Sequence, residues 1–273
     1  MLRLDSLSVD IAARDGRDVR VVDGISFELG ESETLGVVGE SGSGKTMLAL
    51  AIIGLLPAIA RPSGRILLDE ENLLAASEPR MCEVRGARIG MIFQEPMTAL
   101  NPAQRVGVQI AEGLILHRGL GRAAAREESI RLLDRVRIAD ARRRIDAFPH
   151  ELSGGQRQRV GIAIALALDP RLLIADEPTT ALDVTVQKEI LDILDELVTD
   201  MKMSLIFISH DIGVIARIAD RMLVMWNGRS MEQGGTADVL RAPQSSYTQS
   251  LLAAMPRRSR GGLAAGIETR APQ

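Results

Sequence analysis

The amino-acid sequence predicts an α/β fold with a largely parallel sheet, and three observations lead to this prediction. Short apolar runs of strand length alternate with segments of helical period along most of the 273 residues. A glycine-rich turn joins one strand-like run directly to a helical one. Charged side chains make up 25% of the chain and the net charge is −3, which is typical of a folded protein and excludes a strongly basic nucleic-acid-binding surface.

Apolar periodicity predicts the individual elements. The predicted strands are residues 25–29, 35–38, 65–68, 89–93, 172–175, 205–208 and 222–225. The predicted helices are residues 47–56, 106–116, 123–136, 156–168 and 186–198. Residues 101–148 contain helical patterns without strands, which indicates a helical insertion into the sheet. After about residue 255 the periodicity ends and Gly, Pro and Arg become frequent, so residues 256–273 are predicted to be a flexible tail.

The composition excludes several classes of protein. Cys82 is the single cysteine, which rules out an internal disulfide and a four-cysteine metal site and fits a reducing compartment. The longest apolar stretch, residues 47–60, is interrupted by Gly54 and Pro57 and is shorter than the roughly 20 residues of a spanning helix. Aromatic residues make up only 2% of the chain, so the core is expected to be aliphatic.

A phosphate-binding loop follows the strand predicted at residues 35–38. It consists of Gly39, Glu40, Ser41, Gly42, Ser43, Gly44, Lys45 and Thr46. The glycines allow backbone N–H groups to close around phosphate oxygens, and the helix that follows adds its positive N-terminal dipole. We expect Lys45 to bind the β- and γ-phosphates of a nucleoside triphosphate and Thr46 to bind its magnesium ion.

Polar side chains end three of the predicted strands. Asp176 and Glu177 follow an apolar strand, and parallel sheets bind ligands at such carboxyl ends. Asp176 is expected to hold magnesium through water, and Glu177 to act as general base on the attacking water. Gln94 is expected to orient water or sense magnesium, and His210 to reach the γ-phosphate. The alternative, a solvated strand end with a capping Asp, does not explain why the three ends converge.

A second glycine-containing helix N-terminus lies at Ser153, Gly154, Gly155 and Gln156. Ser153 is a suitable N-cap, and the two glycines allow a phosphate to approach the helix end. One nucleotide does not need two such helix ends. We therefore expect a dimer in which each protomer offers this element to the ATP bound by the other.

Taken in their order along the chain, these motifs resemble the ATP-binding subunit of an ABC transporter. The motifs are the phosphate loop, Gln94, Leu152–Gln156, Asp176–Glu177, Thr180–Asp183 and His210. The resemblance implies a nucleotide-binding domain over residues 1–255, with a P-loop NTPase (ABC-type) core, an antiparallel β-subdomain and a helical subdomain inserted at about 97–160.

The same resemblance implies two composite sites for ATP and Mg²⁺ in a head-to-tail dimer. The implied contacts to the partner's ATP come from Ser153, Gly154, Gly155 and Gln156, the implied coupling residue is Asp183, and the implied magnesium ligands are Thr46, Gln94 and Asp176. ABC subunits usually stack an aromatic ring on adenine, yet residues 1–26 contain none. Arg17, Arg20 or Val19 is expected to pack there instead.

Longer stretches resemble the oligopeptide/dipeptide/nickel import subfamily. They are Met91–Pro102, Val106–Glu112, Thr180–Gln187 and Tyr247–Leu252. This resemblance implies an ATP-hydrolysing importer subunit for di- or oligopeptides, with nickel chelates, glutathione and peptide-like antibiotics as alternatives. It implies a second ATPase subunit (a paralogue is favoured over a second copy), two membrane permeases, and indirectly an extracytoplasmic solute-binding protein. The expected place is the cytoplasmic face of the inner membrane, without a nucleic-acid partner.

Two other interpretations are weaker. A soluble ABC ATPase of DNA repair or translation needs a basic surface or long inserted arms, and the net charge of −3 fits this poorly. A degenerate domain that binds ATP without hydrolysing it is disfavoured because Lys45, Asp176, Glu177 and His210 are all present.

Overall fold

The computed structural model describes residues 1–12, 17–94, 100–180 and 182–254. The chain divides into two compact units, the first formed by Met1–Met81 and Ser204–Gln273 and the second by Cys82–Met203. The predicted tail at 256–273 and the beginning of the predicted helical subdomain lie outside the described residues.

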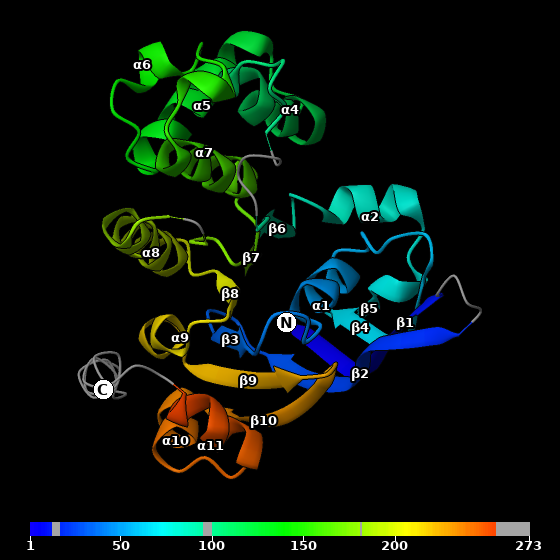
Figure 1. The fold of residues 1–273 in the computed structure, drawn as a ribbon. Coiled ribbons are helices and arrows are strands. Elements are labelled where there is room, and N and C mark those ends of the chain that lie inside the picture. Colours follow the sequence, from blue (N-terminus) through cyan, green and yellow to red (C-terminus); the bar gives the residue numbers. More distant parts are fainter. Residues whose placement is uncertain (13–16, 95–99, 181, 255–273) are drawn as a thin grey trace. The chain divides into compact units, whose positions relative to one another are not determined.

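The first unit contains an antiparallel sheet of four strands (Figure 1). Its strand order is β2 (Asp18–Leu29), β1 (Leu2–Ala12), β4 (Ala60–Leu68) and β5 (Glu71–Asn72), and every printed pair is antiparallel. Leu2, Leu4, Leu7 and Val9 of β1 are buried, although the register shifts between Leu4 and Leu7. This sheet is the antiparallel subdomain that the sequence predicts.

A second sheet in the first unit carries the predicted parallel strands. Its order is β10 (Arg229–Gly235), β9 (Arg221–Trp226), β3 (Thr34–Val38) and β8 (Ser204–Ser209). Strand β3 is parallel to both β8 and β9, and β10 is antiparallel to β9. All residues of β3 and β8 are buried, as expected for strands covered on both faces.

Helices cover this sheet. They are α1 (Lys45–Ile52), α9 (Ile212–Ile218), α10 (Thr236–Arg241) and α11 (Ser246–Ala253). Helix α9 lies very close to β3 at Gly36, where a Cβ atom would be 2.4 Å from Cγ2 of Ile215. The 3₁₀ helix η1 (Leu73–Ala75) follows β5.

The second unit combines two parallel strands with a group of helices (Figure 1). The strands are β6 (Ile89–Ile92) and β7 (Leu172–Asp176). The helices are α4 (Val106–Arg118), α5 (Arg122–Arg135), α6 (Ala141–Arg144), η2 (Pro149–Glu151), α7 (Gly154–Leu166) and α8 (Val184–Asp200). Helix α2 (Glu78–Val84) runs across the boundary between the units in the sequence. Described residues between 101 and 148 form helices without strands, as predicted.

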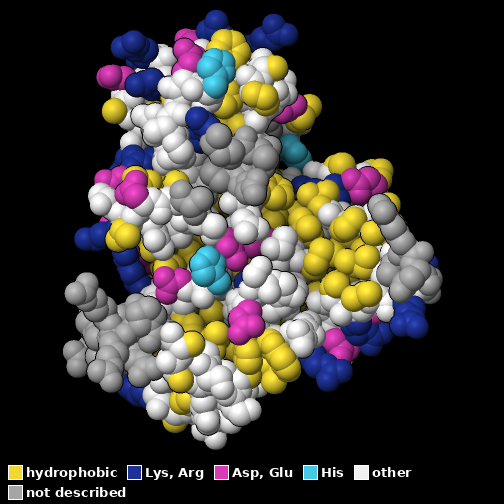
Figure 2. Space-filling model, in the orientation of Figure 1, with side chains coloured by type: hydrophobic (Ala, Val, Ile, Leu, Met, Phe, Trp, Pro, Cys, Tyr) yellow, Lys and Arg dark blue, Asp and Glu magenta, His cyan; other side chains and the backbone are white. Residues whose placement is uncertain are grey.

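The core is aliphatic, as the composition predicts. Among the described residues, Phe27 and Phe207 are the only aromatic side chains in the buried set, while Phe93 and Trp226 are each 42% exposed. Exposed apolar residues include Leu55 and Ile59 before β4, and hydrophobic side chains gather over the β4–β5 region (Figure 2). Within the described chain, we find no helix with the length and apolar character needed to cross a bilayer.

All predicted strands and helices are present, with shifted ends. The helix predicted at 47–56 begins at Lys45 and ends at Ile52. It stops there because Gly54 adopts φ 64° and the N–H of Leu55 donates to the carbonyl of Leu50, which closes a Schellman-type end. The two-residue strand β5 was not predicted, nor were strands β1 and β10. Their alternation is interrupted by register shifts, so neither segment shows a clean two-residue period.

Candidate functional site

The phosphate loop connects β3 to α1 and depends on glycine at two positions. Gly42 and Gly44 have φ angles of +80° and +99°, in the region that side chains disfavour. A Cβ atom at Gly44 would also lie 2.3 Å from the carbonyl oxygen of Val21. Gly44 is the N-cap of α1 and has no side chain to cap the helix, so the first N–H groups face the loop. This backbone is suited to an anion.

Lys45 lies within this loop and is only 5% exposed. Its ammonium donates to the carbonyl oxygens of Gly39 and Glu40, each at 2.8 Å, and lies 3.4 Å from Oγ of Ser43. These contacts hold the ammonium inside the loop, where it would meet an anion bound by the backbone N–H groups. Thr46 is exposed in the first turn of α1, as a metal-binding hydroxyl requires.

The turn between β9 and β10, which belongs to the same unit as the phosphate loop, packs against that loop. A Cβ atom at Gly39 would lie 2.2 Å from the carbonyl oxygen of Met225, and the N–H of Gly228 donates to the carbonyl of Ser43 at 3.0 Å. Asn227 and Gly228 both have positive φ, which is the type I′ geometry of a two-residue hairpin. This support was missed in the sequence, although an Asn-Gly pair between two runs is the signal that predicts it.

Asp23 ties the same turn to β2. Its N–H donates to the carbonyl of Gly228 at 2.8 Å, and its carboxylate accepts hydrogen bonds from Arg229 at 2.7 Å and Arg20 at 3.2 Å. The Arg229 guanidinium, together with that of Arg20, holds the pKa of Asp23 below its ordinary value. The carboxylate therefore stays ionised and the turn keeps its place at neutral pH.

His210 lies at the carboxyl end of the parallel strands, where the phosphate loop also begins. Val38 pairs with Ser209 in the parallel register of β3 and β8, so the next residues, Gly39 and His210, leave the sheet side by side. Asp211 then caps α9 by accepting a hydrogen bond from the N–H of Gly213 at 2.7 Å. The register thus brings the predicted histidine to the predicted loop.

Gln94, Asp176 and Glu177 come together in the second unit. Ile92 pairs with Ala175 in parallel β6 and β7, so the residues after both strands are neighbours. Nε2 of Gln94 lies 3.4 Å from Oε2 of Glu177, and Oγ1 of Thr180 donates to the same oxygen at 2.8 Å. Glu177 adopts φ +46°, a strained conformation for this residue type. Thr180 had no predicted role, although it lies only three residues after Glu177 and its N–H donates to the carbonyl of Glu177 at 3.2 Å in a local turn.

The helix end at Ser153 forms a capping box. Oγ of Ser153 accepts a hydrogen bond from the N–H of Gln156 at 3.3 Å, and Oε1 of Gln156 accepts one from the N–H of Ser153 at 3.0 Å. The hydroxyl hydrogen of Ser153 and the amide hydrogens of Gln156 remain available as donors. The N-cap of α8 is Asp183, whose Oδ1 accepts a hydrogen bond from the N–H of Val186 at 3.0 Å.

The residues expected near adenine differ in their exposure and in the contacts that they already make. The Arg20 guanidinium is engaged with the carboxylates of Asp10 and Asp23, whereas the Val19 side chain is 52% exposed. Arg17 directly precedes β2 and is exposed. Val19 therefore offers the free apolar surface on β2.

The predicted magnesium ligands fit that ion in chemical type. Thr46, Gln94 and Asp176 all offer oxygen atoms, and Asp176, at the end of β7, is only 1% exposed. Among the described residues, no three His, Cys, Asp or Glu side chains cluster as a metal site. Mg²⁺ commonly binds through one or two carboxylates, water and substrate phosphates, so a single carboxylate suits an ion that arrives with a nucleotide.

Comparison with known proteins shows which family this chain resembles. The family model described as ABC transporter matches residues 22–180. The oligopeptide transport ATP-binding protein OppD of Salmonella typhimurium is 49% identical over 257 residues, covering 94% of this chain and 76% of that protein. OppD of Bacillus subtilis is 46% identical, covering 94% and 72%.

Solved structures show the same fold. The ATP-binding cassette MJ0796, a dimer bound to ADP and Pi in a post-hydrolysis state, superimposes with a TM-score of 0.77 at 26% identity, covering 86% of this chain and 99% of that one. CbiO1 of Clostridium perfringens gives a TM-score of 0.74 at 29% identity, with coverages of 95% and 97%. The chain belongs to the family of ABC transporter ATP-binding proteins, in the group that contains the oligopeptide transport ATP-binding proteins.

Proposed function

We propose that this chain is the ATP-hydrolysing subunit of an importer for di- or oligopeptides, which energises uptake through two separate membrane permeases. The observation that carries this proposal is the 49% identity to an oligopeptide transport ATP-binding protein over 94% of the chain. Nickel chelates, glutathione and peptide-like antibiotics are the alternative solutes. A 51% identical relative from Agrobacterium fabrum, of which this chain covers 44%, is named for peptidoglycan transport.

The proposed reaction transfers the γ-phosphoryl group of ATP to water, and the protein contributes mainly by positioning and charge. Lys45 and the backbone of the phosphate loop bind the phosphates. Glu177 accepts a proton from the attacking water, and Thr180 and Gln94 hold its carboxylate in place. His210 contacts the γ-phosphate. Magnesium, held with the nucleotide by Thr46 and Gln94 and, through water, by Asp176, would neutralise charge on the phosphates.

The proposed active form is a head-to-tail dimer of ATPase subunits, in which a paralogue is favoured over a second copy. The donors left free by the capping box of Ser153 and Gln156 then bind the partner's ATP, and Asp183 couples the two sites. A solute-binding protein outside the cell delivers the solute to the permeases, and the ATPase acts at the cytoplasmic face of the inner membrane.

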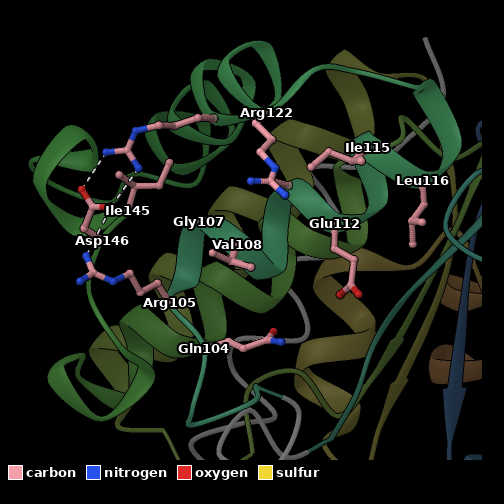
Figure 3. A pocket seen from close by; sticks show the side chains of 12 residues that line it. Gln104, Arg105, Gly107, Val108, Glu112, Ile115, Leu116, Arg122, Ile145 and Asp146 are labelled. Carbon is pink, nitrogen blue, oxygen red and sulfur yellow. Dashed lines mark hydrogen bonds and ion pairs between the residues drawn. The ribbon is translucent and has the colours of Figure 1, made fainter.

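A groove on the second unit is the proposed contact for a permease (Figure 3). It has a volume of about 500 Å³ and is lined by residues of α4, the start of α5 and the segment after α6. Its exposed apolar side chains include Val108 (55%), Ile115 (38%) and Leu116 (73%). At one end, Arg126 and Asp146 form an ion pair at 2.7 Å. An apolar surface with a charged rim suits a short amphipathic helix from the membrane subunit.

The test is peptide uptake by proteoliposomes that contain this subunit with its permeases and partner ATPase. Glu177→Gln should retain ATP binding, accumulate the ATP-bound dimer and lower hydrolysis by about a hundredfold or more, because the general base is lost. Asp200→Asn, which removes an exposed carboxylate of the same unit, is the matched control.

Near-normal turnover in Glu177→Gln would contradict the assignment of the base. ATP-dependent uptake of nickel chelates or glutathione, with no uptake of di- and oligopeptides, would replace the proposed solute by one of the alternatives.

A further inference from the structure

The N-terminus of α7 lies against the N-terminus of α8 within the second unit. A Cβ atom at Gly155 would lie 2.6 Å from Cγ1 of Val186, and real Cβ atoms do not approach other carbon atoms so closely. A β-branched side chain in a helix has one strongly preferred rotamer, so Val186 cannot rotate away freely. Gly155 is therefore needed for the contact between these two helices of the same chain.

The neighbouring glycine differs. A Cβ atom at Gly154 would meet only Cδ2 of Leu182, at 3.8 Å, which is an ordinary van der Waals contact. Access for a partner's phosphate would favour glycine at both positions, because both lie in the first turn of α7. The steric demand from this chain falls on Gly155 alone.

Val186 is held in place by the start of its own helix. Its N–H donates to Oδ1 of Asp183 at 3.0 Å, and the N–H of Gln187 donates to the carbonyl of Asp183 at 2.8 Å. These two hydrogen bonds thus join the first turn of α8 to Asp183.

A second contact lies one turn further along both helices. Arg159, four residues after Gly155, forms an ion pair with Glu189, three residues after Val186. Residues three and four apart share a helix face, so both contacts belong to one interface. Arg159 also donates to the carbonyl of Arg137 at 2.8 Å, and Arg137 pairs with Glu196 of α8 at 2.6 Å. The interface therefore runs along α8.

We propose that Val186 is a positioning residue that sets where α8 holds the signature residues Ser153–Gln156, through its contact with Gly155. This contact links the segment that carries Glu177 and Asp183 to the helix end offered to the partner's ATP. The link between subunits rests on the proposed function; the contact itself does not.

The test uses Gly155→Ala, the double variant Gly155→Ala/Val186→Ala, and the control Gly155→Ala/Val184→Ala. Val184 is the same residue type in the same helical turn but is 82% exposed. In the urea measurement below, adding Val186→Ala should relieve the overpacking in Gly155→Ala, whereas adding Val184→Ala should relieve nothing. Because Gly155 is also proposed to face the partner's ATP, hydrolysis by the assembled transporter is compared for the single variants Val186→Ala and Val184→Ala with Gly155 intact. Val186→Ala should lower kcat about threefold or more, because α7 loses the contact that positions its N-terminus, and Val184→Ala should not.

Urea unfolding of the full chain without nucleotide is the second measurement. Alanine favours a helix more than glycine does, so Gly155→Ala would raise the unfolding midpoint if the site were open. We expect the midpoint to fall and to recover with Val186→Ala only. A rise of the midpoint in Gly155→Ala, its recovery with Val184→Ala, or equal hydrolysis by Val186→Ala and Val184→Ala would overturn the proposal. If the wild type hydrolyses no ATP, the proposed function fails, while the urea series still decides whether the contact exists.

Discussion

At the scale of single residues, the candidate base depends on a threonine whose role local sequence does not reveal. Thr180 donates to Oε2 of Glu177 at 2.8 Å, shorter than the 3.4 Å from Gln94. A hydrogen bond to a carboxylate restricts the rotamers that its side chain can adopt. Glu177 also needs such support because its backbone adopts φ +46°.

Thr180→Val, which removes the hydroxyl and keeps the shape, should lower kcat for ATP hydrolysis about tenfold, with KM for ATP changed by less than about twofold. Thr180→Ser keeps the hydroxyl and should retain most of the activity. Steady-state kinetics on the assembled transporter measures both values. A rise in KM without a fall in kcat would assign Thr180 to nucleotide binding instead.

At the scale of elements, the C-terminal helix is fastened to the sheet that carries the phosphate loop. Glu232 of β10 accepts hydrogen bonds from the N–H groups of Gln244 at 2.7 Å and Ser245 at 3.1 Å, which fixes the start of α11. Tyr247 of α11 stacks on Trp226, with 5.5 Å between ring centroids. Trp226 directly precedes the turn that supports the loop, so α11 covers this support.

Glu232 makes the attachment of α11 dependent on pH. Burial raises the pKa of this carboxyl, but the hydrogen bonds that it accepts, foremost the one from the N–H of Gln244, outweigh burial and bring the pKa below its ordinary 4.5. A lowered folded-state pKa stabilises the protein above the unfolded value, and this stabilisation disappears as pH falls through the folded value.

Glu232→Gln should therefore lower the urea midpoint by a constant amount above about pH 6, and the difference from wild type should shrink below about pH 4.5. Urea titrations of both proteins across this range measure it. A difference that stayed constant down to about pH 3 would show that the ionised carboxylate is not the stabilising form.

At the scale of the whole molecule, the subunit must join a membrane partner to act as proposed. The face drawn in Figure 2 intersperses basic and acidic side chains, in line with the net charge of −3. Because no single sign of charge dominates this face, burial of apolar surface is the main source of affinity for a partner. The groove along α4 offers such surface, with Leu116 as its most exposed apolar side chain.

Leu116→Glu should reduce co-purification of the permeases with the subunit by about tenfold or more, because a charge would be buried in the contact. ATP binding by the purified subunit should not change. Leu55→Glu changes a 42% exposed leucine outside the groove and serves as the control. Equal loss with both variants would show a general effect of surface charge.

Elements with a strong local signal were predictable. Glycine spacing predicts the phosphate loop, and apolar periodicity predicts the apolar strands and α8. Strand β1 was not predictable, because its positive φ at Ser6 and its register shifts break the two-residue alternation. Such irregularities are tolerated only because β2 and β4 flank the strand on both sides.

The sequence by itself determined the fold class, the family, the phosphate loop and the residues at the strand ends, because these depend on residue type at fixed spacing. Only the tertiary structure decided that the Asn227–Gly228 turn supports the loop, and that a side chain at Gly155 would clash with Val186. These contacts join residues whose separation in the sequence carries no periodic signal. Packing selects them, and packing is a property of the folded chain.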